Sequence, residues 1–285
     1  MVLVDFNGLA IGSIMGQLSR GEELSENLVK HIIINNLRIY RNKYKEADYG
    51  KMVIACDSYS WRKDVFPEYK AQRKANRATD KHDWPMIFDL IEDTLNDLRE
   101  NFPYAVIKID SAEADDIIGA LTVHKSTPLI GEDVVIISAD KDFIQLQQYG
   151  HVEQWSPMFN KMIKEDNPRK YLFEHLLKGD AGDGVPNANS HDDVFTTGSR
   201  QTPMTQKQID KYWDNHDDLE MIMKPNVYRN FMRNVQMIDL TNTPDGIREE
   251  AINKYDNYIY PPRSNILTYL IEHRMKMLID NAAEF

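Results

Sequence analysis

The sequence has few of the features that mark secreted or membrane proteins. Its single cysteine, Cys56, excludes a disulfide within the chain and is typical of a reducing compartment. No apolar run approaches the ~20 residues that a membrane helix needs. The first residues, MVLVDFNG, lack a basic segment followed by a long apolar block, so they do not predict a secretion signal. We therefore expect a cytoplasmic protein that does not contact a membrane.

The chain also lacks a net positive charge, which at first argues against a nucleic-acid partner. Its formal net charge is −11, whereas affinity for DNA usually depends on neutralising phosphates. The distribution of charge weakens that objection, because Arg62–Arg77 contains six basic residues and only two acidic ones. The excess of acidic residues must therefore lie elsewhere in the chain, and the place where these residues cluster indicates where a functional site lies.

Apolar runs alternate with helical patterns over the first half of the 285 residues. Two helices are indicated by apolar stripes, one at 28–44 with Ser25 as its N-cap and one at 87–98 with Pro85 in its first turn. Continuous apolar runs indicate strands that are covered on both faces. The four runs, each followed by an acid, are Val2–Val4, Met52–Cys56, Ala105–Ile109 and Val134–Ile137.

This alternation predicts an α/β fold with a largely parallel central sheet and flanking helices over residues 1–160. After that point the strand signals fade. Helical patterns near 169–178, 205–223, 225–237 and 264–281 predict a smaller helical C-terminal lobe over residues 161–285.

Acidic residues follow the predicted strands. In an open parallel sheet the carboxyl ends of the strands meet at one edge, where ligands bind. A further pair in KGDAGDGVP would join this edge if the helical lobe folds back. The acids in question are Asp5, Asp57, Glu113, Asp115, Asp116, Asp140 and Asp142, with Asp180 and Asp183 as the further pair.

So many carboxylates in one cleft would repel one another and raise one another's pKa values, which hard cations would relieve. Mg²⁺ prefers oxygen ligands, and two such ions ~3.5–4 Å apart can activate a water and stabilise the leaving oxygen of a phosphodiester. No His or Cys accompanies these acids, and the eight histidines show no ligand spacing, which disfavours zinc. We therefore predict a site for two Mg²⁺ ions, in which Mn²⁺ can substitute.

Each acid taken alone has a simpler interpretation. A lone Asp after a strand is usually a turn residue. The acids at 113–116 could complement the start of a helix at 113–124 that Ser111 caps. Asp142 could open a helix, and Asp180 with Asp183 could cap a loop. The conjunction of these acids in one sheet favours the metal site.

A basic segment, WRKDVFPEYKAQRKANRATDK, follows the second strand and has few apolar anchors. Its simple interpretation is a solvated helix or loop. The functional interpretation is a mobile arch at 61–82 that covers the metals and orders when phosphates bind. In a helix, residues 70, 73, 74 and 77 would share one face and could clamp a phosphate. Tyr69 is a packing group or stacks on a base. The candidate nucleic-acid contacts in this segment are Arg62, Lys63, Tyr69, Lys70, Arg73, Lys74 and Arg77.

The motifs DFNG, ACDS, PEYKAQRKANR, SAEADDIIG, SADKD and LKGDAGDG occur in this order along the chain. They resemble the flap-endonuclease/5′-nuclease family, and within it the ribonucleases H of T-even-like bacteriophages. The resemblance extends over nearly the whole chain, including QWSPM and the C-terminal PPR. It departs from the family at Gly184, where the usual GDxxDN pattern has Asn.

This resemblance implies a structure-specific 5′ nuclease that removes RNA primers and 5′ flaps in lagging-strand synthesis, acting as a 5′→3′ exonuclease and a flap endonuclease. It implies that Asp116 supports the metal site from an outer position and that Lys70 and Arg73 contact the scissile phosphate. The implied partners are branched or nicked DNA, RNA–DNA hybrid, a single-stranded-DNA-binding protein and a sliding clamp, with the enzyme a monomer. The implied ligands are Asp5, Asp57, Glu113 and Asp115 for one metal, and Asp140, Asp142, Asp180 and Asp183 for the second.

Three alternatives share some of these features. A PIN-like endoribonuclease has the same layout of acids, but such domains usually lack the arch and the helical lobe. A phosphatase of the haloacid-dehalogenase kind needs D-x-D after its first strand, whereas this chain has Asp5-Phe6-Asn7. A DNA-binding module with a vestigial site would not need the full set of acids.

Overall fold

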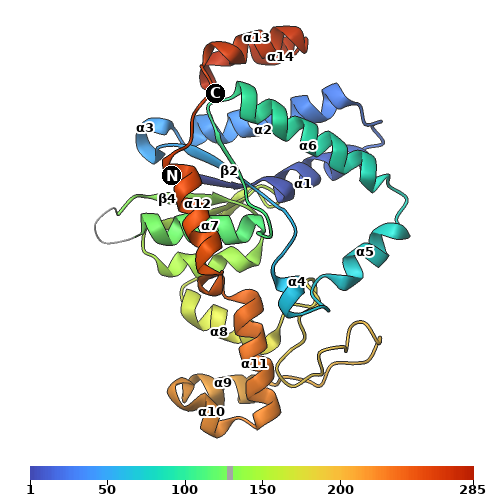
Figure 1. The fold of residues 1–285 in the computed structure, drawn as a ribbon, viewed down its shortest axis with the longest axis vertical. Helices are drawn as coiled ribbons and strands as arrows, with labels where there is room; N and C mark the ends of the chain where they lie inside the picture. Colours follow the sequence, from blue (N-terminus) through green and yellow to red (C-terminus); the bar gives the residue numbers. More distant parts are fainter. Residues whose placement is uncertain (127–130) are drawn as a thin grey trace.

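A six-stranded sheet forms the centre of the molecule, in the order β3-β2-β1-β4-β5-β6 (Figure 1). The computed structural model describes residues 1–126 and 131–285, without the side chains of residues 74–76. Five strands are parallel, and β6 pairs antiparallel with β5. The strands are β1 (Val2–Asp5), β2 (Met52–Cys56), β3 (Ala105–Lys108), β4 (Val134–Ile137), β5 (Val152–Ser156) and β6 (Lys161–Ile163).

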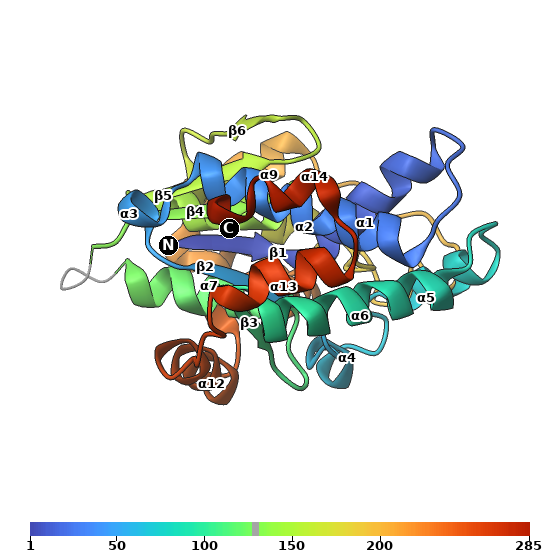
Figure 2. The same ribbon diagram turned by 90° about the horizontal axis from the view of Figure 1, so that it is seen from above.

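Helices cover both faces of this sheet, because consecutive apolar side chains of a strand point to opposite faces. Val2 and Val4 pack into one hydrophobic cluster and Leu3 into another. The first cluster lies under α1 (Phe6–Leu18), α2 (Glu26–Lys43), α3 (Glu46–Tyr49) and α6 (Trp84–Asn101), and the second under α7 (Ala114–Lys125), η1 (Lys141–Gln148) and α12 (Asp245–Asp256). Figure 2 shows the sheet between these layers, with β6 at one edge and β3 at the other.

Residues after β6 are distributed over three packing environments. One group of helices forms a third hydrophobic cluster beyond the sheet. The α12 helix packs on α7, and the last helices pack on the cluster that contains α2 and α6. Whether 161–285 folds as a lobe of its own stays a prediction. The helices of the third cluster are α8 (Pro168–Lys178), α9 (Gln206–Trp213), α10 (Leu219–Ile222) and α11 (Pro225–Ile238). The short η2 (His216–Asp218) lies between α9 and α10, and η3 (Leu240–Asn242), α13 (Ser264–Glu272), α14 (Lys276–Ile279) and η4 (Ala282–Glu284) follow.

The basic segment forms α4 (Arg62–Val65) and α5 (Ala71–Ala78), which in Figure 1 follow one side of the molecule between α6 and the helices α8–α11. The expectation that it has few apolar anchors is wrong. Trp61, Phe66 and Tyr69 are buried in the third cluster. The segment is therefore tied to α8–α11 at its first half, while Lys63 and Arg73 are exposed.

A second tie joins this segment to the turn after α8. The backbone N–H of Lys70 donates to the carbonyl of Asp183 over 2.7 Å. The next residue, Gly184, has a φ of +74°, and a Cβ there would lie 2.8 Å from the carbonyl oxygen of Glu68. The left-handed backbone favours glycine or asparagine, and the close approach of the Glu68 carbonyl leaves no room for the Cβ of asparagine. This accounts for Gly184 in place of the Asn of the family pattern.

The order of the strands places the functional edge. The chain runs from β1 to β2 to β3 in one direction and then crosses to β4 on the other side of β1. The carboxyl ends of β1 and β4 therefore flank a switch point, where ligands of open α/β sheets bind. Asp5 ends β1 and Asp140 follows β4, so both lie beside it.

The predicted α/β class and the four predicted strands are confirmed, as are the N-cap Ser25 and the helix that Pro85 opens. The pattern missed β5 and β6, in which polar residues interrupt the apolar positions, and the helices α1 and α12. Ser111 does not cap α7, since Glu113 is its N-cap and forms a capping box with Asp116. Within the described residues, no helix has the length and apolar character to cross a bilayer.

Candidate active site

Acidic and basic side chains line one cavity of about 570 Å³ at the carboxyl edge of the sheet. We call it the acid cavity. Its acids come from the ends of β1, β2 and β4 and from the start of α7, and its bases come from α4, α5 and the residues just before α5. The cavity therefore unites predicted metal ligands with predicted phosphate contacts. These lining residues are Asp5, Asp57, Glu113, Asp115 and Asp140, and Lys63, Lys70, Arg73 and Arg77.

Backbone groups and a serine orient the acids at the strand ends. Asp5 caps α1 by accepting from the N–H of Gly8 at 3.0 Å, and it accepts from the Ser138 hydroxyl at 2.8 Å. Asp57 accepts from the N–H of Ala114 at 2.9 Å, at the first turn of α7. Asp5 thus caps α1 and Asp57 accepts from the first turn of α7, and the remaining lone pairs of both are available to a cation.

The loop that carries Asp140 is held by residues that the sequence did not single out. The Asp140 N–H donates to the Ser138 hydroxyl at 3.1 Å. Gln154 of β5 is fully buried, and its amide donates to the carbonyls of Ser138 (3.1 Å) and Asp140 (2.6 Å). A polar residue in a strand would weaken a pattern-based strand prediction, yet here it positions the site.

Burial and mutual repulsion raise the pKa values of several acids. Burial, then the Asp57 carboxylate, raise the pKa of Asp5 to about 6. Burial also raises the pKa of Asp57. For Asp115, burial and then the Asp140 carboxylate raise the pKa well above its usual value. Carboxylates placed against their own repulsion in this way favour a bound cation, which lowers the free energy of the ionised forms.

Glu113 differs from its neighbours because basic and hydroxyl groups surround it. Its carboxylate accepts from Lys70 Nζ at 2.5 Å, from Ser60 Oγ at 2.7 Å and from the Tyr69 hydroxyl at 2.9 Å. Although burial would raise it, Lys70 and then Arg62 hold the pKa of Glu113 at about 2. Glu113 is therefore ionised, and it is oriented by the basic segment at 61–82, which we call the arch segment.

The prediction that Arg62 contacts nucleic acid does not agree with its position. Arg62 is 2% exposed, and its guanidinium donates to Asp116 at 2.9 and 3.0 Å and to Glu113 at 3.1 Å. Asp116 also accepts from the hydroxyl of Thr243 at 2.8 Å and does not line the acid cavity. The Arg62–Asp116 pair is thus an internal support that joins α4 to α7, and an outer role for Asp116 stays a prediction.

The cationic residues before and in α5 contact a further acid. Lys70 has a φ of +55° and lies before the start of α5, so it does not share a helical face with the residues that follow. Its Nζ lies 3.3 Å from Asp183, which also pairs with Arg73. Tyr69 is buried and donates to Asp183 at 3.0 Å, so its ring is a packing group. Lys70 and Arg73 remain within the acid cavity.

The other predicted nucleic-acid contacts differ in how far they are defined. Lys63 is exposed at the cavity, and Arg77 lies over the rings of Trp84 and Phe88 at 5.1 and 5.0 Å. The side chain of Lys74 lies outside the described part of the structure.

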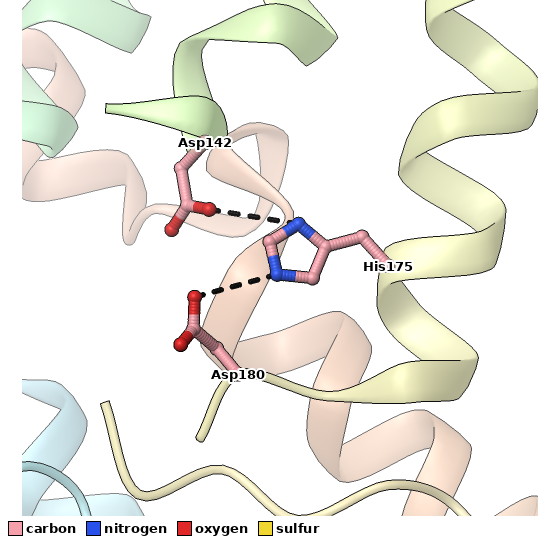
Figure 3. Close-up of side chains that lie close together, drawn as sticks. All are labelled: Asp142, His175 and Asp180. Atoms are coloured by element: carbon pink, nitrogen blue, oxygen red, sulfur yellow. Dashed lines mark ion pairs between the residues drawn. The ribbon is translucent and has the colours of Figure 1, made fainter. Parts of the chain in front are cut away.

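Asp142 and Asp180 form a separate group with a histidine (Figure 3). His175 of α8 lies with one ring nitrogen facing each acid, and we call the three residues the histidine cluster. The expectation that no histidine accompanies the acids is therefore wrong. Burial, then the Asp140 carboxylate, raise the pKa of Asp142 to about 7. Although burial would raise it, His175 and Lys141 hold the pKa of Asp180 below its usual range.

Comparison with known proteins identifies the family. A model of the 5′-3′ exonuclease N-terminal resolvase-like domain matches residues 2–173, and a model of the T4 RNase H C-terminal domain matches residues 168–285. The chain belongs to the 5′-3′ exonuclease family. Ribonuclease H of Enterobacteria phage T4 is 30% identical over 99% of this chain and 95% of its own length. Flap endonuclease Xni of Shewanella pealeana is 31% identical over 50% of this chain and 55% of its own length.

Solved structures of the 5′-3′ exonuclease family have the same fold. The T5 5′-exonuclease with bound zinc ions superposes with a TM-score of 0.61 at 15% identity, covering 90% of this chain and 98% of that one. The T5 flap endonuclease in a complex with DNA and metal ions has a TM-score of 0.61 at 16% identity, covering 90% and 99%. The predicted fold and family are thus confirmed, and the chain is a nuclease by its family.

Replacement of Arg62 tests the internal support. In Arg62→Met, Asp116 and Glu113 lose their shared guanidinium inside the protein, so the free energy of unfolding should fall by about 3–5 kcal/mol. Lys63→Met, at an exposed position of the same helix, should change it by less than about 0.5 kcal/mol. Urea unfolding followed by circular dichroism measures both. Equal midpoints for the two variants would contradict the role of Arg62.

The raised pKa values also predict how stability depends on pH without divalent metal. Asp5, with a pKa of about 6, holds a proton in the folded state that the unfolded chain, near 3.9, has released. The proton on Asp5 therefore contributes to the free energy of unfolding fully below about pH 4, and this contribution is lost as pH rises through about 6. Urea unfolding in EDTA should therefore show stability falling between about pH 4 and 6, and falling less in Asp5→Asn. An identical pH dependence in the variant would show that Asp5 titrates normally.

Proposed function

We propose that this member of the 5′-3′ exonuclease family is a divalent-metal-dependent 5′ nuclease with 5′→3′ exonuclease and flap-endonuclease activities. Its role would be to remove RNA primers and adjacent DNA during lagging-strand replication. The observation that carries the proposal is the acid cavity, where strand-end acids with raised pKa values face the basic residues of the arch segment. Acids alone would fit many metal sites, whereas acids that face the lysine and arginine side chains of the arch segment fit a bound phosphodiester.

The donor set fits two Mg²⁺ ions, with Mn²⁺ as a substitute. Carboxylate oxygens are the ligands that hard divalent cations prefer, and hydrogen bonds orient Asp5 and Asp57 while leaving lone pairs free. When bound, two such ions supply an activated water and stabilise the departing 3′ oxygen. The proposed ligands are Asp5, Asp57, Glu113 and Asp115 at one ion, and Asp140, Asp142, Asp180 and Asp183 at the other.

Lys70 and Arg73 would stabilise negative charge on the phosphate that is cleaved. Both line the acid cavity, and both are paired with Asp183 in this structure. A phosphate that enters the cavity brings oxygens that compete with this carboxylate for the same donors. Fixed cations at the place where charge develops stabilise the transition state more than the substrate.

A second cavity of about 900 Å³ adjoins the acid cavity and shares Asp5, Gly8 and Asp140 with it. It continues along α1, where Gly12 and Gly16 leave open space above the helix. Arg20 and Lys141 add positive charge to its lining. This space supports a substrate that extends on both sides of the cleaved bond, as a nucleic-acid strand does.

The substrates would be branched or nicked DNA and RNA–DNA hybrid. By their printed descriptions, the Xni relatives are flap endonucleases, and the T5 flap endonuclease binds DNA and metal ions. A single-stranded-DNA-binding protein and a sliding clamp are the proposed protein partners of a monomeric enzyme in the cytoplasm. These partners rest on the family resemblance.

Substitution of one acid tests the assignment of the site. Asp115→Asn and Asp140→Asn should abolish Mg²⁺-dependent cleavage of an end-labelled 5′ flap, a nicked duplex and an RNA–DNA hybrid, while DNA binding persists. The physical reason is the loss of a carboxylate ligand at the point where the acids converge. Asp110→Asn is the matched control, because Asp110 also follows a strand but is exposed and does not line the acid cavity. Near-normal turnover in Asp115→Asn would refute the site.

Removal of a cation tests the phosphate contact. Lys70→Ala should lower both the cleavage rate and the affinity for flap DNA, and should reduce the slope of log affinity against log salt by about 1. Lys276→Ala, an exposed lysine on α14, is the control and should leave the slope unchanged. Fluorescence anisotropy at several salt concentrations measures the slope, and a wild-type slope in Lys70→Ala would remove this contact from the mechanism.

A further inference from the structure

One buried histidine lies between two carboxylates next to the acid cavity. Nδ1 of His175 is 3.5 Å from Oδ1 of Asp142, and its Nε2 is 3.4 Å from Oδ2 of Asp180. Figure 3 shows both acids on the side of the ring that carries the nitrogens. Ligand atoms from all three residues lie within 4.8 Å of one another. An imidazole nitrogen and two carboxylate oxygens are thus gathered around one small volume.

The local fold holds the three side chains in this arrangement. His175 lies in the last turn of α8, and α8 packs against η1, which carries Asp142. The chain then reverses at Gly179, whose φ is +67° and where a Cβ would lie 2.4 Å from the carbonyl oxygen of Val185. Paired backbone hydrogen bonds between Asp180 and Val185, at 2.7 and 2.8 Å, close the turn. Asp180 therefore returns to face the helix that it has just left.

The contacts within the cluster do not satisfy its polar atoms. Oδ1 of Asp142 and Nε2 of His175 are buried and have no hydrogen-bond partner among the described residues. The two separations exceed the 2.7–3.2 Å of ordinary N–H···O bonds. Only 7% of the His175 side chain is exposed, so bulk water has little access to its ring nitrogens. Orphaned buried polar atoms of this kind point to an ion or a catalytic role.

We propose that His175 is a nitrogen ligand of a divalent cation, which it binds together with Asp142 and Asp180. The inference rests on the proposed metal-dependent function and deepens it, because it gives one of the two cation positions a mixed nitrogen and oxygen ligand set. Neutral imidazole binds through one ring nitrogen, and Nε2 is the buried nitrogen without a partner.

This ligand set changes which cation the position prefers. Mg²⁺ takes carboxylate, carbonyl and water ligands, whereas imidazole suits transition metals. Replacing one oxygen ligand by imidazole therefore favours Mn²⁺ and the later divalent ions over Mg²⁺ at this position. The acid cavity itself contains no histidine among its lining residues and keeps its preference for hard cations.

Lys141 lies close enough to compete with the cation. Its Nζ is 3.0 Å from Oδ2 of Asp180, but half of the side chain is exposed. The lysine can therefore withdraw into solvent when a divalent ion takes its place. His175 has no such freedom, since its ring is enclosed by α8, η1 and the turn.

Pulsed electron paramagnetic resonance of the Mn²⁺-loaded full-length protein tests the proposal. Directly bound imidazole gives a ¹⁴N hyperfine coupling, which should appear in the wild type and change to a ¹⁵N coupling after labelling with ¹⁵N-histidine. The coupling should vanish in His175→Gln and persist in His151→Gln, whose histidine is exposed on the loop before β5. Labelling identifies a histidine ligand without any variant, so the test survives a poorly folded His175→Gln.

Affinity measurements separate ligation from simple positioning. By calorimetry, His175→Gln should weaken Mn²⁺ binding at one position by at least about tenfold and Mg²⁺ binding much less. Equal losses for both ions would show that His175 only positions the two acids and would overturn the proposal. Stoichiometric Mn²⁺ binding without any nitrogen coupling would also overturn it, yet leave the proposed nuclease function intact. If neither ion binds and no cleavage occurs, both proposals fail.

Discussion

Repulsion between carboxylates is the constraint on which the site depends. The topology of the sheet brings Asp5, Asp57, Asp115 and Asp140 to one edge, and the folded chain holds them there although their pKa values rise or their charges oppose each other. Such an arrangement lowers stability unless cations are near. In this structure the nearby cations are the lysine and arginine side chains of the arch segment. These side chains offset part of the negative charge that, under the proposed function, bound metal ions would also offset.

Three kinds of contact hold the arch segment in place. Trp61 and Phe66 anchor it in the helical cluster, Arg62 ties it to α7 inside the protein, and Lys70 meets Glu113 at the cavity. Only the outermost of these contacts involves groups that a phosphate could replace. The buried contacts therefore fix where the segment starts, and under the proposed function Lys70 and Arg73 would exchange their carboxylate partners for phosphate oxygens. An arch that was mobile along its whole length could not present Lys70 at a defined point.

Sequence patterns predicted the parts of the molecule that depend on local periodicity and on general topology. Continuous apolar runs marked β1 to β4, and the rule for parallel sheets placed Asp5, Asp57 and Asp140 together. Contacts distant along the chain escaped these rules. Gln154 sits in β5 as a buried polar residue, which breaks the apolar pattern, but its amide holds the loop of Asp140.

His175 and Arg62 show the same limit for single residues. In the sequence, His175 stands five residues before Asp180 on an amphipathic helix, and only the packing of α8 on η1 brings it to Asp142. Arg62 belongs to a basic run and would be assigned to a charged surface, whereas its guanidinium neutralises Asp116 in the interior. Charge counted along the chain cannot separate a cation that binds phosphate from one that balances a buried acid.

The two acid groups of the site are therefore unequal, and the inequality has a physical basis. Around the acid cavity, charge is balanced by lysine and arginine side chains of the arch segment. In the histidine cluster, a rigid ring with both nitrogens facing carboxylates occupies the interior, where rearrangement would disturb the packing of α8. A cation at the proposed first position would compete with Lys70 and Arg73, whereas one at the proposed second position would displace Lys141 and lie among the ligands of the histidine cluster. Rigid ligands select among cations by geometry and ligand type, and flexible ones select mainly by charge.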